Sequence, residues 1–194
     1  MVKTSSTMLP LGTKPPHFEL TNAVDGRSLT LDDFGAATAL LVMFICNHCP
    51  YVQHVRSELG RLARDYMSAG LAIAAVNSNS KETHPEDGPS QMRELALTEG
   101  WDFPYLFDES QAVAKSFRAA CTPDFFLFDA DRRLAYRGQL DESRPGNLVP
   151  VTGQDLRQAI EAVLMGEPPL EKQVPSIGCN IKWRPGNEPE YWGA

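Results

Sequence analysis

Residues 39–49, ALLVMFICNHC, hold the pattern that decides the fold. The first seven residues are a continuous apolar run, which is typical of a strand buried on both faces of a sheet. Beyond Cys49 the apolar residues recur at steps of three and four, which indicates one face of a helix. These residues are Val52, Val55, Leu59, Leu62 and Tyr66. The Cys46-Asn47-His48-Cys49 motif therefore stands where a buried strand passes into a helix.

The rest of the chain continues this alternation of strands and helices. The helix is expected to stop at Gly70, and residues 71–76, LAIAAV, predict a second buried strand. The remaining patterns predict a strand at 105–107, helices at 91–98, 111–119 and 153–164, and hairpins pairing 18–20 with 28–31 and 125–128 with 134–136. This order implies an α/β fold in which helices flank a mixed central sheet.

The domain organisation follows from composition. Residues 1–16 are polar and contain proline, and they are expected to form a leader arm. Residues 17–165 are expected to form one domain that begins with the N-terminal hairpin. Residues 166–194 have little periodicity and are expected to be a C-terminal extension packed on that domain.

Charge and length exclude several classes of protein. The chain has 194 residues with 18 Lys and Arg against 25 Asp and Glu, a net charge of −7, which disfavours nucleic-acid binding. It has no apolar run of the roughly 20 residues that a membrane helix needs. The N-terminus lacks the apolar core of a signal peptide, so the expected location is the cytoplasm. Four cysteines are too few for a disulfide scaffold, and a close pair in a reducing compartment indicates catalysis or metal binding.

The Cys-x-x-Cys motif suits thiol chemistry. Two thiols this close can form a disulfide across the first helical turn, where backbone N–H groups stabilise a thiolate. We expect Cys46 to be the exposed thiol and its pKa to fall, helped by a protonated His48. Two alternatives remain open: both cysteines are inert and buried, or they are half of a zinc site. The zinc site would need two further ligands from Cys121, Cys179, His48 and His54.

A second signal lies at Cys121-Thr122-Pro123, directly before the apolar run FFLF. A proline at a strand start does not interrupt the hydrogen-bond ladder. If the Thr122–Pro123 bond is cis, the preceding backbone groups are available to pair with an extended substrate. A trans proline in an ordinary loop is the alternative.

Together the two signals resemble the thioredoxin fold. The leader hairpin and the strings FICNHCPYV, PYLFDESQAVAKSF, CTPDFFLFD, YRGQLDESRPGN and PSIGCNIKW resemble the redoxins, which include the AhpC/TSA and TlpA-like proteins, and within them the peroxiredoxin-like group. The resemblance covers roughly residues 10–185 and also includes NSN and PEDG after the second strand. It implies that Cys46 is the nucleophile, that Cys49 is the resolving thiol, and that Thr122 and Pro123 face them on the substrate side.

Two departures from the related families bear on the chemistry. Thioredoxins bury an acid on the strand before the disulfide, but residues 41–44 read LVMF, so water or His48 would have to act as base. Peroxiredoxins place Thr or Ser three residues before the peroxidatic cysteine. If Cys49 takes that role, Cys46 stands where the hydroxyl should be, and a peroxiredoxin mechanism is disfavoured.

The sequence therefore predicts a thiol-disulfide oxidoreductase whose dithiol is its only redox group, with no metal or other cofactor. Its expected partners are a disulfide-containing protein or small thiol substrate and a recycling reductase, with neither nucleic acid nor membrane. The alternatives are a thiol peroxidase, a non-enzymatic metal-binding or metal-delivery protein, and a binding module with incidental cysteines. Cys121 is either a third redox partner near the site or, the favoured interpretation, a packing residue. Cys179 is a possible extra thiol, for which a structural role is favoured.

Overall fold

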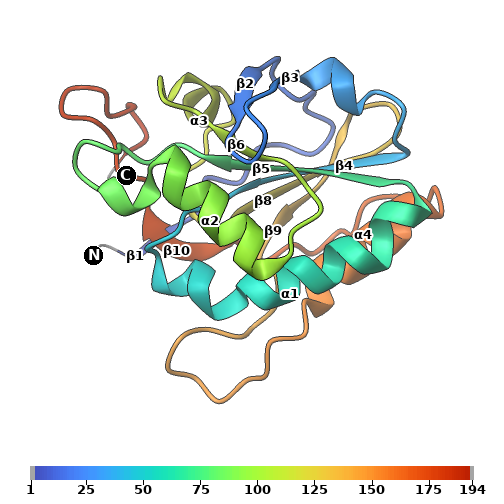
Figure 1. The fold of residues 1–194 in the computed structure, drawn as a ribbon. Helices are drawn as coiled ribbons and strands as arrows, with labels where there is room; N and C mark the ends of the chain where they lie inside the picture. The colour runs from blue at the N-terminus through green and yellow to red at the C-terminus, as the bar shows by residue number, and fades with distance from the viewer. Residues whose placement is uncertain (1–2, 193–194) are drawn as a thin grey trace.

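The computed structural model describes residues 3–192 and contains a mixed sheet of seven strands (Figure 1). The strand order is β3-β2-β6-β5-β4-β8-β9. The strands are β2 (Glu19–Asn22), β3 (Ser28–Thr30), β4 (Ala39–Phe44), β5 (Leu71–Asn77), β6 (Tyr105–Phe107), β8 (Asp124–Phe128) and β9 (Leu134–Gly138). Central β4 is parallel to β5 and antiparallel to β8, so the prediction of a mixed α/β sheet is confirmed.

Helices cover both faces of this sheet (Figure 1). The helices α1 (Pro50–Tyr66), α2 (Pro89–Glu99) and α4 (Gln154–Leu164) pack on one face, and α3 (Ala112–Ser116) packs on the other. Side chains of a strand alternate between faces, and β4 shows this directly. Leu41 and Met43 belong to the core under α1, whereas Val42 and Phe44 belong to the core beside α3. This is why the run in β4 is apolar at every position.

The predicted helix at 111–119 is shorter in the structure. The α3 helix ends at Ser116, and Arg118 adopts a left-handed backbone conformation with φ of 51°. A residue in that conformation cannot continue a right-handed helix. The chain then turns toward β7 (Cys121–Thr122), where the Thr122–Pro123 peptide bond is cis.

A second, small sheet joins the two ends of the chain. Its order is β1-β10-β7, and both pairings are antiparallel. The strand β1 (Lys3–Ser5) lies in the leader arm and β10 (Ile177–Asn180) lies in the C-terminal extension. The sequence analysis missed both strands, because segments of three or four residues with mixed polarity have no readable period. Residues 1–2 and 193–194 of these two segments lie outside the described residues.

The start of β8 is anchored by a buried ion pair. Asp124 and Arg137 of β9 are fully buried, with Arg137 Nη2 3.5 Å from Asp124 Oδ2. Asp124 also accepts a hydrogen bond from the Ser6 hydroxyl, and the Arg137 guanidinium lies 4.7 Å from the Phe126 ring centroid. Burial raises the pKa of the Asp124 carboxyl, and the positive charge of Arg137 opposes that rise. The pair therefore fixes the segment that carries Thr122 and Pro123.

We expect Arg137→Met to lower the free energy of unfolding by about 3–5 kcal/mol, because Asp124 keeps its burial and loses its cation. The loss should shrink at acidic pH, since a protonated Asp124 needs no counter-charge. Urea unfolding at several pH values measures both effects. Arg133→Met, at the neighbouring turn, is the control and should change stability by less than about 0.5 kcal/mol. A loss of similar size in both variants would contradict the role given to the pair.

Candidate redox site

The Cys46–Cys49 loop connects β4 to α1. After Phe44 the chain leaves the strand, and Cys49 occupies the N-cap of α1 with extended backbone angles. Pro50 follows at the first helical position, where a missing N–H removes no helical hydrogen bond. The structure holds all four cysteines of the chain as thiols, and all four are buried.

Three of the four thiols meet beside the cis peptide. Cys46 Sγ lies 3.4 Å from Thr122 Oγ1, and Cys49 Sγ lies 3.2 Å from the Thr122 carbonyl oxygen. The thiols of Cys179 and Cys46 both lie close enough to that of Cys49 to lower its pKa. Cys49 is therefore the middle thiol of a row, with Cys46 on one side and Cys179 on the other. The predicted site residue Thr122, in β7, stands directly against this row, and the predicted Pro123 follows it through the cis peptide bond, before β8.

The middle position lowers the pKa of Cys49. Hydrogen bonds from Cys179 and Cys46, and from the Val52 backbone N–H, hold its pKa well below the ordinary value although burial opposes ionisation. Burial instead raises the pKa of Cys46, and the hydrogen bond to Cys49 and the charge of Asp87 add to that rise. Our expectation that Cys46 is exposed and has a lowered pKa is wrong for this state, in which Cys46 is 0 % exposed. The helix N-terminus acts on the N-cap thiol, which is Cys49.

A buried carboxylate that the sequence analysis overlooked holds the loop. Asp87 lies at the end of a short 3-10 helix, Pro85–Asp87, and its Oδ1 accepts hydrogen bonds from the backbone N–H groups of Asn47 (2.7 Å) and His48 (3.2 Å). Its Oδ2 lies 2.5 Å from His48 Nδ1 and accepts a bond from Asn79 Nδ2 at 2.8 Å. The string PEDG, one of those that carried the family resemblance, was the signal that could have identified it.

Asp87 and His48 form an ion pair within this network. The hydrogen bond to Asp87 raises the pKa of His48 above its ordinary value, although partial burial opposes the rise. Burial also opposes ionisation of Asp87, but bonds from His48 and Asn79 keep the pKa of the carboxyl below its usual range. The His84 ring stacks on His48 with centroids 4.7 Å apart, and burial together with the His48 charge lowers the pKa of His84. The strand β4 has no buried acid before the Cys46–Cys49 motif, but Asp87 of the 3-10 helix Pro85–Asp87 places a buried carboxylate beside that motif.

The remaining candidates lie apart from the row of thiols. Cys121 Sγ is directed at the Pro123 carbonyl oxygen at 3.6 Å, and burial and the charge of Asp124 raise the pKa of this thiol. His54, a ligand considered for the zinc alternative, has its Nε2 2.7 Å from Ser143 Oγ.

A different group of residues could hold a metal ion. One ligand atom from each of Cys46, His48 and Asp87 lies within 4.8 Å of the other two.

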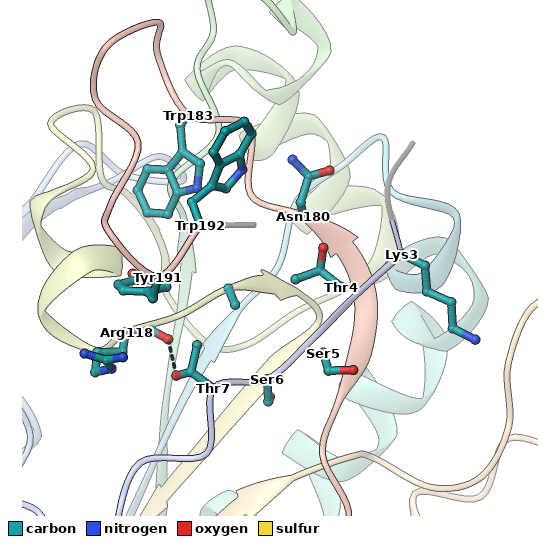
Figure 2. Close-up of a pocket in the computed structure, with 11 residues that line it drawn as sticks. Lys3, Thr4, Ser5, Ser6, Thr7, Arg118, Asn180, Trp183, Tyr191 and Trp192 are labelled. Atoms are coloured by element: carbon teal, nitrogen blue, oxygen red, sulfur yellow. Dashed lines mark hydrogen bonds between the residues drawn. The ribbon is translucent and has the colours of Figure 1, made fainter. Parts of the chain in front are cut away.

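A cavity of about 720 Å³ lies on the other face of the small sheet (Figure 2). Its walls come from β1, from Arg118 and from the tail, where Trp183, Tyr191 and Trp192 face Thr4 and Asn180. Among its lining residues within the described chain there is no cysteine. Asn180 faces this cavity while its neighbour Cys179 belongs to the core under α1, as alternation along a strand requires.

Within residues 3–192, no helix has the length and apolar character to cross a membrane.

The fold and the site together define a thioredoxin-fold protein with a Cys-x-x-Cys motif opposite a cis-proline. The redoxin family model matches residues 10–156, and the chain belongs to the redoxin family. This confirms the family and fold that the sequence motifs indicated. Membership supports a redox function of the thioredoxin type. A comparison with the curated proteins found no significant match.

Solved structures agree with this assignment. A conserved uncharacterized protein from Geobacillus kaustophilus is 54 % identical with a TM-score of 0.94, over 96 % of this chain and 98 % of that chain. A hypothetical protein from Sinorhizobium meliloti is 50 % identical with a TM-score of 0.93, over 94 % and 100 %. The thioredoxin domain of a Bacteroides vulgatus thiol-disulfide oxidoreductase is 18 % identical with a TM-score of 0.62, over 81 % and 99 %, and shows the shared fold.

The Asp87–His48 pair predicts a pH-dependent stability. The His48 contribution is complete below its unfolded pKa of 6.5 and is lost as pH rises through its higher folded value. The Asp87 contribution is complete above its unfolded pKa of 3.8 and is lost as pH falls through its lower folded value. Asp87→Asn should therefore cost about 2–4 kcal/mol between these limits and less at about pH 9. Urea unfolding at about pH 5.5 and about pH 9 tests this.

The control for this prediction is Glu86→Gln, which neutralises the exposed acid next in the chain. It should change stability by less than about 0.5 kcal/mol at either pH. A loss in Asp87→Asn that is equal at both pH values would show that the His48 charge contributes nothing.

Proposed function

We propose that this redoxin is a thiol-disulfide oxidoreductase whose redox group is the Cys46–Cys49 dithiol. The observation that carries the proposal is the pair of neighbouring thiols at the N-terminus of α1, each in contact with Thr122 before the cis Pro123. Two thiols this close need little movement to become a disulfide. The dithiol itself carries the electrons, so the reaction requires no further cofactor.

We propose the following sequence of steps, in which Cys49 acts as the base for Cys46. The Cys49 thiolate takes the proton of Cys46, and the new Cys46 thiolate attacks the substrate disulfide. One substrate sulfur stays bound to Cys46, and the other leaves as a thiolate that takes the proton back from Cys49. Cys49 then attacks Cys46 sulfur, which releases the second substrate thiolate and leaves the Cys46–Cys49 disulfide. The substrate disulfide is reduced as the dithiol is oxidised, and the reverse sequence oxidises a substrate dithiol.

The proposed partners are a disulfide-containing protein or small disulfide and a dithiol reductase that restores the site, and the proposed location is the cytoplasm. Each of the three thiols in the row is at most 2 % exposed, so the substrate must meet an opened form of the site. His48, half-buried at the edge of the loop, is placed to influence the first step through its positive charge.

Disulfide reduction assays on single variants test the proposal. Cys46→Ser should lower turnover of a small aromatic disulfide by at least about a hundredfold, because the attacking thiol is gone. Cys49→Ser should instead accumulate a mixed disulfide on Cys46 that mass spectrometry detects. The adduct should form more slowly, because the base is gone, and persist, because the resolving thiol is gone. Cys121→Ser removes a buried thiol outside the row and is the control. Wild-type turnover in Cys46→Ser, or no adduct in Cys49→Ser, would contradict the assigned roles.

A second candidate function is metal binding, which the closeness of Cys46, His48 and Asp87 favours. Sulfur, imidazole nitrogen and carboxylate oxygen together suit zinc. His48 Nδ1 bonds Asp87, whereas His48 Nε2 is buried and has no hydrogen-bond partner within the described residues.

Metal content after purification and dialysis separates the two proposals. A metal-binding role requires about one zinc per chain, with the amount falling at least about tenfold in His48→Ala. Cys121→Ser should retain the wild-type amount, because Cys121 lies outside the group. Retention below about a tenth of an equivalent in wild type would rule this candidate out.

A further inference from the structure

The strand β10 covers the backbone edge beside the cis peptide. Cys179 pairs with Thr122 and Asn180 pairs with Cys121 in the antiparallel register. Gly178 lies so close to the cis peptide that an added Cβ would stand 1.9 Å from the Thr122 carbonyl oxygen. An extended substrate would add a strand to this edge, so β10 now fills the substrate's place. The segment that lies beside the Cys46–Cys49 dithiol is therefore β10 of the same chain.

This pairing sets the thiol of Cys179 against Cys49. Side chains alternate along β10, so Asn180 faces the cavity of Figure 2 and Cys179 faces the N-terminus of α1. Cys179 is 2 % exposed and belongs to the same core cluster as Cys49 and Cys46, close enough to Cys49 to lower its pKa. Cys121, the fourth thiol, is directed at Pro123 and lies outside the row. The structure therefore offers Cys49 two exchange partners.

We propose that Cys179 is a third redox thiol, which receives the disulfide from Cys46–Cys49 and forms Cys49–Cys179. This inference rests on the proposed function, because that function supplies the Cys46–Cys49 disulfide. Cys179 loses its proton to solvent, and its thiolate attacks Cys49 sulfur. The bond between Cys46 and Cys49 breaks, and Cys46 leaves as a thiolate that takes up a proton. The number of disulfides is unchanged, so the transfer needs no oxidant or reductant.

Formation of the Cys46–Cys49 disulfide makes Cys179 a better nucleophile, because it lowers the pKa of the Cys179 thiol. In the reduced protein the hydrogen bond to Cys49, together with burial and the Cys49 charge, raises the pKa of Cys179. A Cys46–Cys49 disulfide removes that charge, while Lys182 remains as a nearby cation that lowers the pKa of Cys179. Cys179 becomes more acidic when Cys49 becomes a disulfide sulfur.

The transferred disulfide has a structural consequence. It joins β10 covalently to the N-cap of α1, so the segment that fills the substrate edge can no longer leave it. It also restores the Cys46 thiol. The redox state of the chain thereby determines whether the tail can open, and reduction of Cys49–Cys179 releases β10.

The test follows the disulfides of the wild-type chain over time. The reduced protein receives one equivalent of dithiodipyridine at acidic pH, where thiol exchange is slow, and is then moved to about pH 8 without further reagent. Samples are quenched with acid, alkylated and mapped by peptide mass. We expect the Cys49–Cys179 linkage to grow as Cys46–Cys49 declines, with a single disulfide per chain throughout.

Matched variants identify the route. Cys179→Ser should keep the Cys46–Cys49 linkage, and Cys121→Ser should behave as wild type. Gly178→Ala should slow the transfer about tenfold, because the added Cβ displaces β10 from the cis peptide. Gly60→Ala is its control, since a Cβ there meets its nearest atoms at 3.4 Å.

The outcomes separate this inference from the function on which it rests. A Cys46–Cys49 disulfide that persists in wild type with no Cys49–Cys179 linkage overturns the relay and leaves the oxidoreductase proposal intact. Absence of any Cys46–Cys49 disulfide overturns both, because there is then no bond to transfer. Transfer at the wild-type rate in Gly178→Ala overturns the role given to β10.

Discussion

The pairing of β10 with β7 is the interaction on which the site depends. It unites both ends of the chain in one small sheet, because β1 pairs with the other edge of β10. The same pairing places Cys179 on Cys49 and covers Thr122. Buried backbone groups need hydrogen-bond partners, and β10 satisfies those of β7. The closed, buried state of the thiols follows from this backbone requirement.

Charge is distributed around the thiols in two buried pairs on separate elements. Asp87 with His48 secures the loop between β4 and α1, and Asp124 with Arg137 secures the strand after the cis-proline. Each carboxylate is held by hydrogen bonds as well as by its cation, as a buried charge requires. The two segments that must face one another are thus fixed independently. The small sheet is held by fewer paired residues than the central sheet.

Much of the fold was readable because it rests on local periodicity. In β4 every residue is apolar and buried, and in α1 the buried apolar residues recur every three or four positions. Both patterns are visible in the sequence. The motif at their junction, and the Thr-Pro before β8, then placed the dithiol opposite the proline. The short strands β1 and β10 could not be read this way, because their partners are distant in sequence and their side chains show no period.

The sequence by itself determined the class of fold and the position of the Cys46–Cys49 motif, and its resemblance to the redoxins indicated the residues that oppose it. Only the tertiary structure decided which thiol has the lowered pKa, since this depends on the closeness of Cys179 and Cys46 to Cys49. It also decided that Asp87, from a polar turn far along the chain, supplies the buried acid. The physical reason is common to both: a pKa depends on what surrounds a group in space, and contacts between distant segments leave no local pattern in the sequence.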